Sequence, residues 1–152
     1  MISTFLSWIR KRQKESFLGE GSRSENTAIL RVLLVEAVGR DGQRLLEALH
    51  GGGHSVYSSQ ITERGHLDAA FRDETWDVVL LSCALPGLPA SEVVDLLQEL
   101  GLTLPVILTI ERGSLDFPFE LLEYGACDFV FKSNPTRLLA VIERECTKAQ
   151  LS

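Results

Sequence analysis

Short apolar runs alternate with amphipathic segments from Leu30 to the end of the chain. The apolar runs span four to eight residues, the length of strands that are buried on both faces. The segments between them repeat apolar residues every three or four positions, which predicts helices. We expect strands at 31–37, 54–58, 76–83, 104–110 and 128–131, and helices at 40–50, 63–72, 91–100, 115–124 and 135–149.

This strict alternation predicts βαβ units with right-handed crossovers, and therefore an α/β domain built on a central parallel sheet. In sheets of this kind, ligands bind beyond the carboxyl ends of the strands. The residues at or just after the predicted strand ends are Glu36, Ala37, Ser82, Thr109, Ile110 and Lys132.

The first 28 residues have a different pattern. Residues 1–18 place Ile2, Phe5 and Ile9 at helical spacing ahead of a basic cluster, which predicts an amphipathic helix. Residues 19–28 are rich in glycine, serine and charge, as in a linker. We therefore divide the chain into an N-terminal helix (1–18), a linker (19–28) and one domain (29–149).

Composition narrows the class of protein. The net charge is −6, and the first 27 residues contribute +2, so the remainder carries −8. An acidic domain is a poor candidate for nucleic-acid binding, because phosphate contacts need clustered Lys and Arg. Three widely spaced cysteines, with no Cys-x-x-Cys pair, indicate neither a disulfide framework nor a zinc site. We expect a cytoplasmic protein without a metal or cofactor.

Four segments together carry a family resemblance: RVLLVEA (31–37), WDVVLLSCALPG (76–87), LPVILTI (104–110) and YGACDFVFK (124–132). With them, residues 30–148 resemble the receiver domain of two-component response regulators. The resemblance implies a doubly wound, flavodoxin-like sheet of five parallel strands in the order 2-1-3-4-5.

The residues that carry receiver chemistry are largely missing. The family accepts phosphate on an aspartate four residues before the proline of its Leu-Pro pair, and that position is Ser82 here. Of the acidic pair that holds magnesium, the chain keeps Glu36 and replaces the other residue with Ala37. The Thr or Ser that ends strand four falls on Ile110 when counted from Pro105, which leaves Thr109 facing the other side of the strand.

Lys132 is the one matching residue of this set. Glu36 and Lys132 carry opposite charges, so we expect an ion pair in place of a magnesium site. Without a neighbouring base or metal, the Ser82 hydroxyl is not expected to act as a nucleophile.

The sequence thus favours a pseudo-receiver, a regulatory module without enzymatic activity that works by protein interaction or dimerisation. By analogy with the family, the contact face is formed by the fourth helix, fifth strand and fifth helix, which include Leu121, Leu122, Tyr124, Leu138 and Leu139. Two alternatives stay open: a receiver regulated by modification of Ser82, and a small-molecule-binding domain of flavodoxin-like fold.

The N-terminal helix offers a second contact site. Docking on a partner or on a second copy of the chain is favoured over membrane-surface contact by residues 1–14, because one short helix with few basic residues binds membranes weakly. We expect the chain to be the N-terminal part of a longer signalling protein with a downstream output domain.

Overall fold

The computed structural model describes residues 29–111 and 119–151. The predicted N-terminal helix (1–18) and linker (19–28) therefore lie outside the described residues. No helix in the described part of the chain is both long and apolar enough to cross a lipid bilayer.

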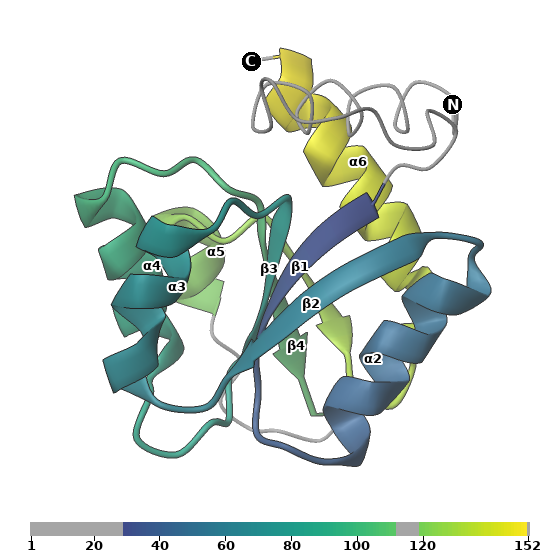
Figure 1. Ribbon diagram of the computed structural model, residues 1–152, viewed down its shortest axis with the longest axis horizontal. Helices are drawn as coiled ribbons and strands as arrows, with labels where there is room; N and C mark the ends of the chain where they lie inside the picture. Colours follow the sequence, from purple (N-terminus) through teal and green to yellow (C-terminus); the bar gives the residue numbers. More distant parts are fainter. Residues whose placement is uncertain (1–28, 112–118, 152) are drawn as a thin grey trace.

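Five parallel strands form the central sheet (Figure 1). They are β1 (Ile29–Val35), β2 (Ser55–Ile61), β3 (Val78–Ser82), β4 (Val106–Ile110) and β5 (Asp128–Phe131). Their order is β2-β1-β3-β4-β5, with every neighbouring pair parallel. The predicted fold class and strand order are confirmed.

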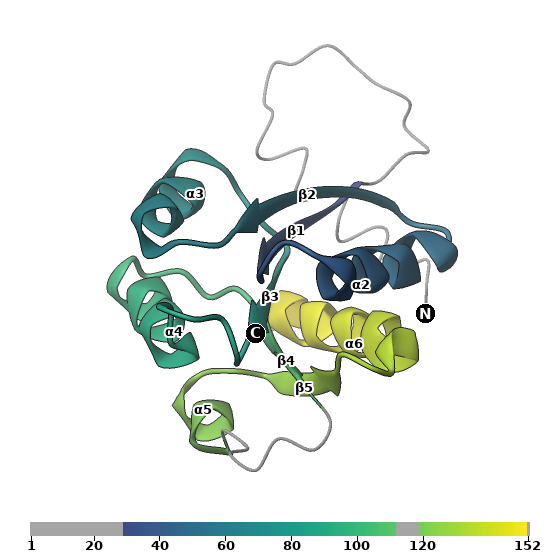
Figure 2. The same ribbon diagram turned by 90° about the horizontal axis from the view of Figure 1, so that it is seen from below.

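Helices cover both faces of the sheet (Figure 2). One face is packed by α2 (Arg40–Gly51) and α6 (Leu138–Leu151), and the other by α3 (Leu67–Asp73), α4 (Ala90–Glu99) and α5 (Phe119–Tyr124). Each face buries its own apolar cluster. The molecule is thus a three-layer α/β sandwich, as the alternation of strand and helix patterns predicts.

Two predicted helices, 63–72 and 135–149, begin with a short 3-10 turn. These turns are η1 (Arg64–His66) and η2 (Pro135–Arg137). The second predicted strand, 54–58, continues to Ile61, because all seven residues of β2 pair with β1. The strand therefore includes the polar residues Ser58, Ser59 and Gln60, whose backbone pairs with β1 although their side chains are not apolar.

Successive side chains of a strand point to opposite faces of the sheet. This alternation decides which residues at the carboxyl ends of the strands lie on the same face. In β3, Val79 and Leu81 pack toward α3, α4 and α5, whereas Val78 and Leu80 pack toward α2 and α6. Ser82, two residues after Leu80, therefore lies on the α2–α6 side. The same parity places the site residues of the other strands.

Candidate functional site

Four polar side chains gather at the carboxyl end of the sheet, on the side covered by α2 and α6. Each of them lies two residues beyond a strand residue of the core cluster on that side. They are all buried, with exposed fractions between 1 and 5%. The four residues are Glu36, Ser82, Thr109 and Lys132.

Lys132 joins the ends of three strands through its ammonium group. Its Nζ donates a hydrogen bond of 3.1 Å to Glu36 Oε2 and one of 3.0 Å to Ser82 Oγ. Glu36 Oε1 lies 3.0 Å from the same Nζ and has no hydrogen-bond partner among the described residues, so it contacts the ammonium through charge alone. The ion pair that the sequence predicts is present.

Ser82 receives two donors at its hydroxyl oxygen. The second donor is the backbone N–H of Ala84, 3.2 Å from Oγ. Among the described residues, the Lys132 ammonium contacts the carboxylate of Glu36 at 3.0 Å and that of Asp41 at 3.9 Å. The Glu36 carboxylate is paired with the Lys132 ammonium, so it is not free to act as the base that accepts the Ser82 proton.

Thr109, and not Ile110, is the strand-four residue that belongs to this site. Thr109 is the register partner of Ser82 in the parallel ladder, so their side chains lie on the same face. Ile110 packs into the core cluster under α3, α4 and α5. The prediction that Thr109 faces away was wrong, because Pro105 lies outside β4 and counting from it does not fix which residues face α2 and α6. Thr109 Oγ1 is buried without a hydrogen-bond partner among the described residues.

Asp41 approaches the site from the first turn of α2, and sequence reasoning missed it. Its Oδ2 lies 3.9 Å from Lys132 Nζ, and its side chain is 40% exposed. Asp41 is the second residue of α2, and the sequence alone does not show how that helix lies over the end of the sheet. Ala37 contributes only its backbone N–H, which donates to Glu36 Oε2 over 3.1 Å.

The residues present do not fit the magnesium ion that the receiver fold implies. The ammonium of Lys132 contacts both nearby carboxylates, Glu36 and Asp41. A third carboxylate is lacking, because Ser82 stands at the end of β3. Within residues 29–111 and 119–151, no group of three or more His, Cys, Asp or Glu side chains is arranged to hold a metal.

Cys83 lies beside the site as a protonated thiol. Burial raises the pKa of Cys83 to about 11, although the positive charge of Lys132 acts in the opposite direction. A thiol with a raised pKa is a weak nucleophile at neutral pH.

Two of the five residues that the sequence assigned to the contact face are buried in the structure. Leu121 and Leu138 are buried in the two core clusters, so they stabilise the fold and are not available to a partner. Leu139 packs over the end of α2, where a Cβ on Gly52 would overlap its Cδ2. Leu122 is partly buried, and the side chain of Tyr124 lies outside the described residues.

A surface cavity lies at the opposite end of the sheet. It has a volume of about 590 Å³, and its lining includes Arg31, Tyr57 and Trp76. These residues belong to the amino-terminal ends of β1 and β3 and to the edge strand β2. The cavity is therefore separate from the four-residue site.

No family model matches the chain. Among curated proteins, it is 29% identical over 112 residues to the phosphate regulon transcriptional regulatory protein PhoB of Pseudomonas aeruginosa, covering 72% of this chain and 48% of PhoB. It is also 29% identical over 114 residues to the transcriptional regulatory protein TcrA of Mycobacterium tuberculosis, covering 75% of this chain and 44% of TcrA. The chain thus spans about half the length of these relatives.

Two solved structures show the same fold. A CheY-like response regulator receiver domain protein from Methanospirillum hungatei is 21% identical with a TM-score of 0.66, covering 80% of this chain and 97% of that one. NtrX from Brucella abortus is 23% identical with a TM-score of 0.68, covering 80% of this chain and 28% of that one. These two likenesses show that the domain has the fold of response-regulator receiver domains, and the curated relatives are similar to it in sequence over about three quarters of the chain.

Proposed function

We propose that this receiver domain works without phosphorylation, as a regulatory protein-interaction module in a signalling protein. The observation that supports the proposal is the buried contact of Lys132 with both Glu36 and Ser82. Lys132, which matches the lysine of the receiver family, is already satisfied by the side chains of this chain.

The absence of a phosphoacceptor carboxylate is the first reason. A hydroxyl becomes a nucleophile only when a base, a lowered pKa or a metal activates it. Glu36 is paired with an ammonium, and the carboxylates beside Lys132 do not make a magnesium site. Phosphoryl transfer to Ser82 has neither a base nor a metal to assist it, so we infer a non-enzymatic module.

Regulation by a kinase acting on Ser82 is less well supported than the inert module. Ser82 is only 1% exposed, and its hydroxyl oxygen accepts hydrogen bonds from both Lys132 and Ala84. A modifying enzyme would have to open the end of the sheet and break both contacts. The small-molecule alternative finds no support at the strand ends either, since the 590 Å³ cavity lies at the other end.

The interaction role rests on surface chemistry. The acidic body of the domain disfavours nucleic acid, so the proposed partner is a protein. Of the face first assigned to partner contact, Leu122 on α5 and Leu139 on α6 are the described residues that are only partly buried. The proposal that an output domain belongs to the same signalling protein draws support from relatives that are about twice as long.

Incubation with a small phosphodonor and Mg²⁺, followed by intact-mass spectrometry, tests the proposal. We expect no phosphoryl adduct on the wild-type chain. The Ser82→Asp variant is the positive control, because it restores a carboxylate at the residue whose hydroxyl oxygen lies 3.0 Å from Lys132 Nζ. A stable adduct on the wild-type chain would contradict the proposal.

A further inference from the structure

The outer strand β2 is an unprotected edge of the sheet. Its sequence, SVYSSQI, has no charged residue, proline or glycine. All seven residues pair with β1 in continuous register, without a bulge. Figure 2 shows no described helix or strand beyond it. Natural proteins usually guard such an edge with charges, proline, bulges or a covering segment, and the described residues show none of these here.

The backbone groups that face outward can be identified from one hydrogen bond. The N–H of Glu36 donates to the carbonyl of Ile61 at the end of the β1–β2 ladder. In a parallel ladder, alternate residues of a strand point their N–H and C=O groups toward the same neighbour. Odd-numbered residues of β2 therefore bond to β1, and Val56, Ser58 and Gln60 point their backbone groups away from the sheet.

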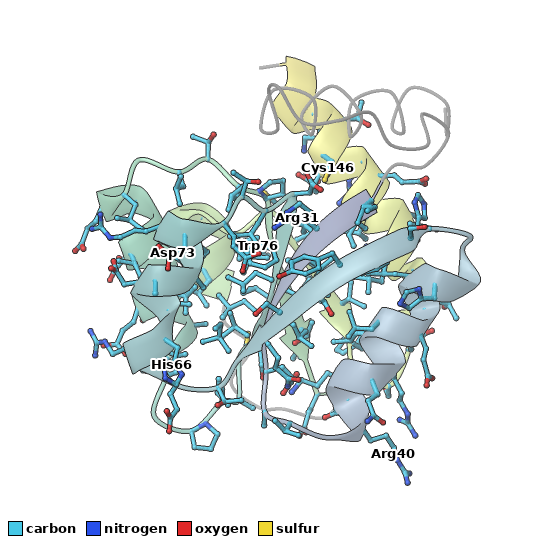
Figure 3. The ribbon with its side chains drawn as sticks, viewed as in Figure 1. Arg31, Arg40, His66, Asp73, Trp76 and Cys146 are labelled. Atoms are coloured by element: carbon cyan, nitrogen blue, oxygen red, sulfur yellow. The ribbon has the colours of Figure 1, made fainter. Side chains whose placement is uncertain are left out.

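Aromatic and ionic contacts hold this edge in place. The Tyr57 hydroxyl donates to Glu74 over 2.8 Å, and the Tyr57 ring stacks on Trp76 at 5.8 Å. The Arg31 guanidinium lies 4.5 Å from the centre of the Tyr57 ring. Figure 3 shows Arg31 and Trp76 next to each other at this end of the sheet. Because the edge is already ordered, adding a strand to it costs little conformational entropy.

We propose that β2 pairs antiparallel with β2 of a second copy of the chain, about a two-fold axis at Ser58. The three outward-facing residues are centred on Ser58, so the symmetric register pairs Ser58 with itself and Val56 with Gln60. Each pair exchanges two backbone hydrogen bonds, about six in all. The two sheets then form one continuous sheet, and a two-fold interface of this kind is complementary to itself.

The symmetric spacing of Val56, Ser58 and Gln60 fits a second copy as the occupant, and charge at this edge does not oppose it. The part of the chain after residue 27 carries −8, so most approaches of one copy to another are repulsive. The β2 edge contributes no charge to that repulsion. Pairing also brings the second copy beside Tyr57 of β2, whose side chain is 41% exposed. This inference does not depend on the chemistry of Ser82.

Sedimentation velocity of the full chain over a range of concentrations tests the dimer. We expect a dimer for the wild-type chain and a monomer for Ser58→Lys and for Ser58→Glu, with at least a tenfold weaker self-association. The side chain at 58 is exposed, so the fold tolerates either change, whereas like charges would face each other at the two-fold axis. Ser91→Lys, on the exposed start of α4, is the matched control and should remain a dimer.

Mixing the two charged variants separates loss of the interface from loss of the fold. An equimolar mixture of Ser58→Lys and Ser58→Glu should form a heterodimer, because opposite charges then meet at the axis. A monomeric wild-type chain, or a dimer that survives both charged substitutions, would overturn the proposal.

Discussion

Glu36 and Lys132 form a buried ion pair although 96 residues separate them in the chain. Their side chains are 5 and 6% exposed, and they connect the end of β1 to the residue that follows β5. Removing one partner leaves a buried charge without compensation, which costs about 3–5 kcal/mol. We expect a loss of this size in the free energy of unfolding of Lys132→Met, measured by urea denaturation.

The double variant Glu36→Leu with Lys132→Met is the control for this ion pair. Replacing both charges with apolar side chains of similar size is often neutral for stability. The double variant should therefore be more stable than Lys132→Met alone. If the loss of unfolding free energy in the double variant equals the sum of the losses in Glu36→Leu and Lys132→Met, the two charges do not stabilise each other, which would contradict the ion pair.

Thr109 and Ser82 should respond in opposite directions to loss of their hydroxyls. Thr109 Oγ1 is buried without a partner in the described part of the chain, so Thr109→Val relieves an uncompensated desolvation cost and should be neutral or stabilising by about 1 kcal/mol. Ser82→Ala deprives the Lys132 ammonium of an acceptor and should destabilise by about 1–3 kcal/mol. Thermal unfolding of the two variants measures both effects, and equal losses would contradict the assignment.

Cys83 should alkylate slowly in the folded protein. Its pKa of about 11 lies roughly two units above that of an unperturbed thiol, so its thiolate fraction near pH 8 is about 100-fold lower. Since the folded-state pKa is the higher one, the neutral thiol favours the folded state until the pH rises through 11. Iodoacetamide labelling followed by peptide mass spectrometry should show slow reaction at Cys83 and a normal rate in urea. Equal rates would contradict the raised pKa.

Leu138 and Leu122 separate core from surface within the face that was assigned to partner contact. Leu138 is fully buried between α6 and the sheet, and Leu138→Ala should cost about 2–5 kcal/mol of unfolding free energy. Leu122 is only partly buried, so Leu122→Ala should cost less. Chemical denaturation distinguishes them, and equal costs would place Leu122 in the core.

A single carboxylate should create a magnesium site. Ser82→Asp brings a third carboxylate to Glu36 and Asp41, so the net charge of the site, with Lys132, falls to −2. Calorimetric titration should detect Mg²⁺ binding in this variant and none in Ser82→Asn, which has the same shape without the charge. Binding to both variants would mean that the wild-type side chains already form the site.

Hydrophobic periodicity was sufficient to predict the five strands and the helices between them, because burial of apolar runs dictates those elements. The strand order came from the resemblance to receiver domains. The ion pair of Glu36 and Lys132 was also accessible, since parallel strand ends meet at one edge. The sequence could not rank Thr109 against Ile110, because a proline outside the strand does not fix which side chains face α2 and α6. Asp41 was missed because its helix had to be placed over the sheet before its carboxylate could be located.

Amide chemical shifts of the wild-type chain, recorded with and without beryllofluoride and Mg²⁺, test the central claim most directly. Beryllofluoride mimics a phosphoryl group only where a carboxylate and a metal site receive it. We predict unchanged shifts at Ser82, Lys132 and the residues of β5, because the ammonium already contacts Glu36 and Ser82. Saturable shifts at these residues would contradict the account.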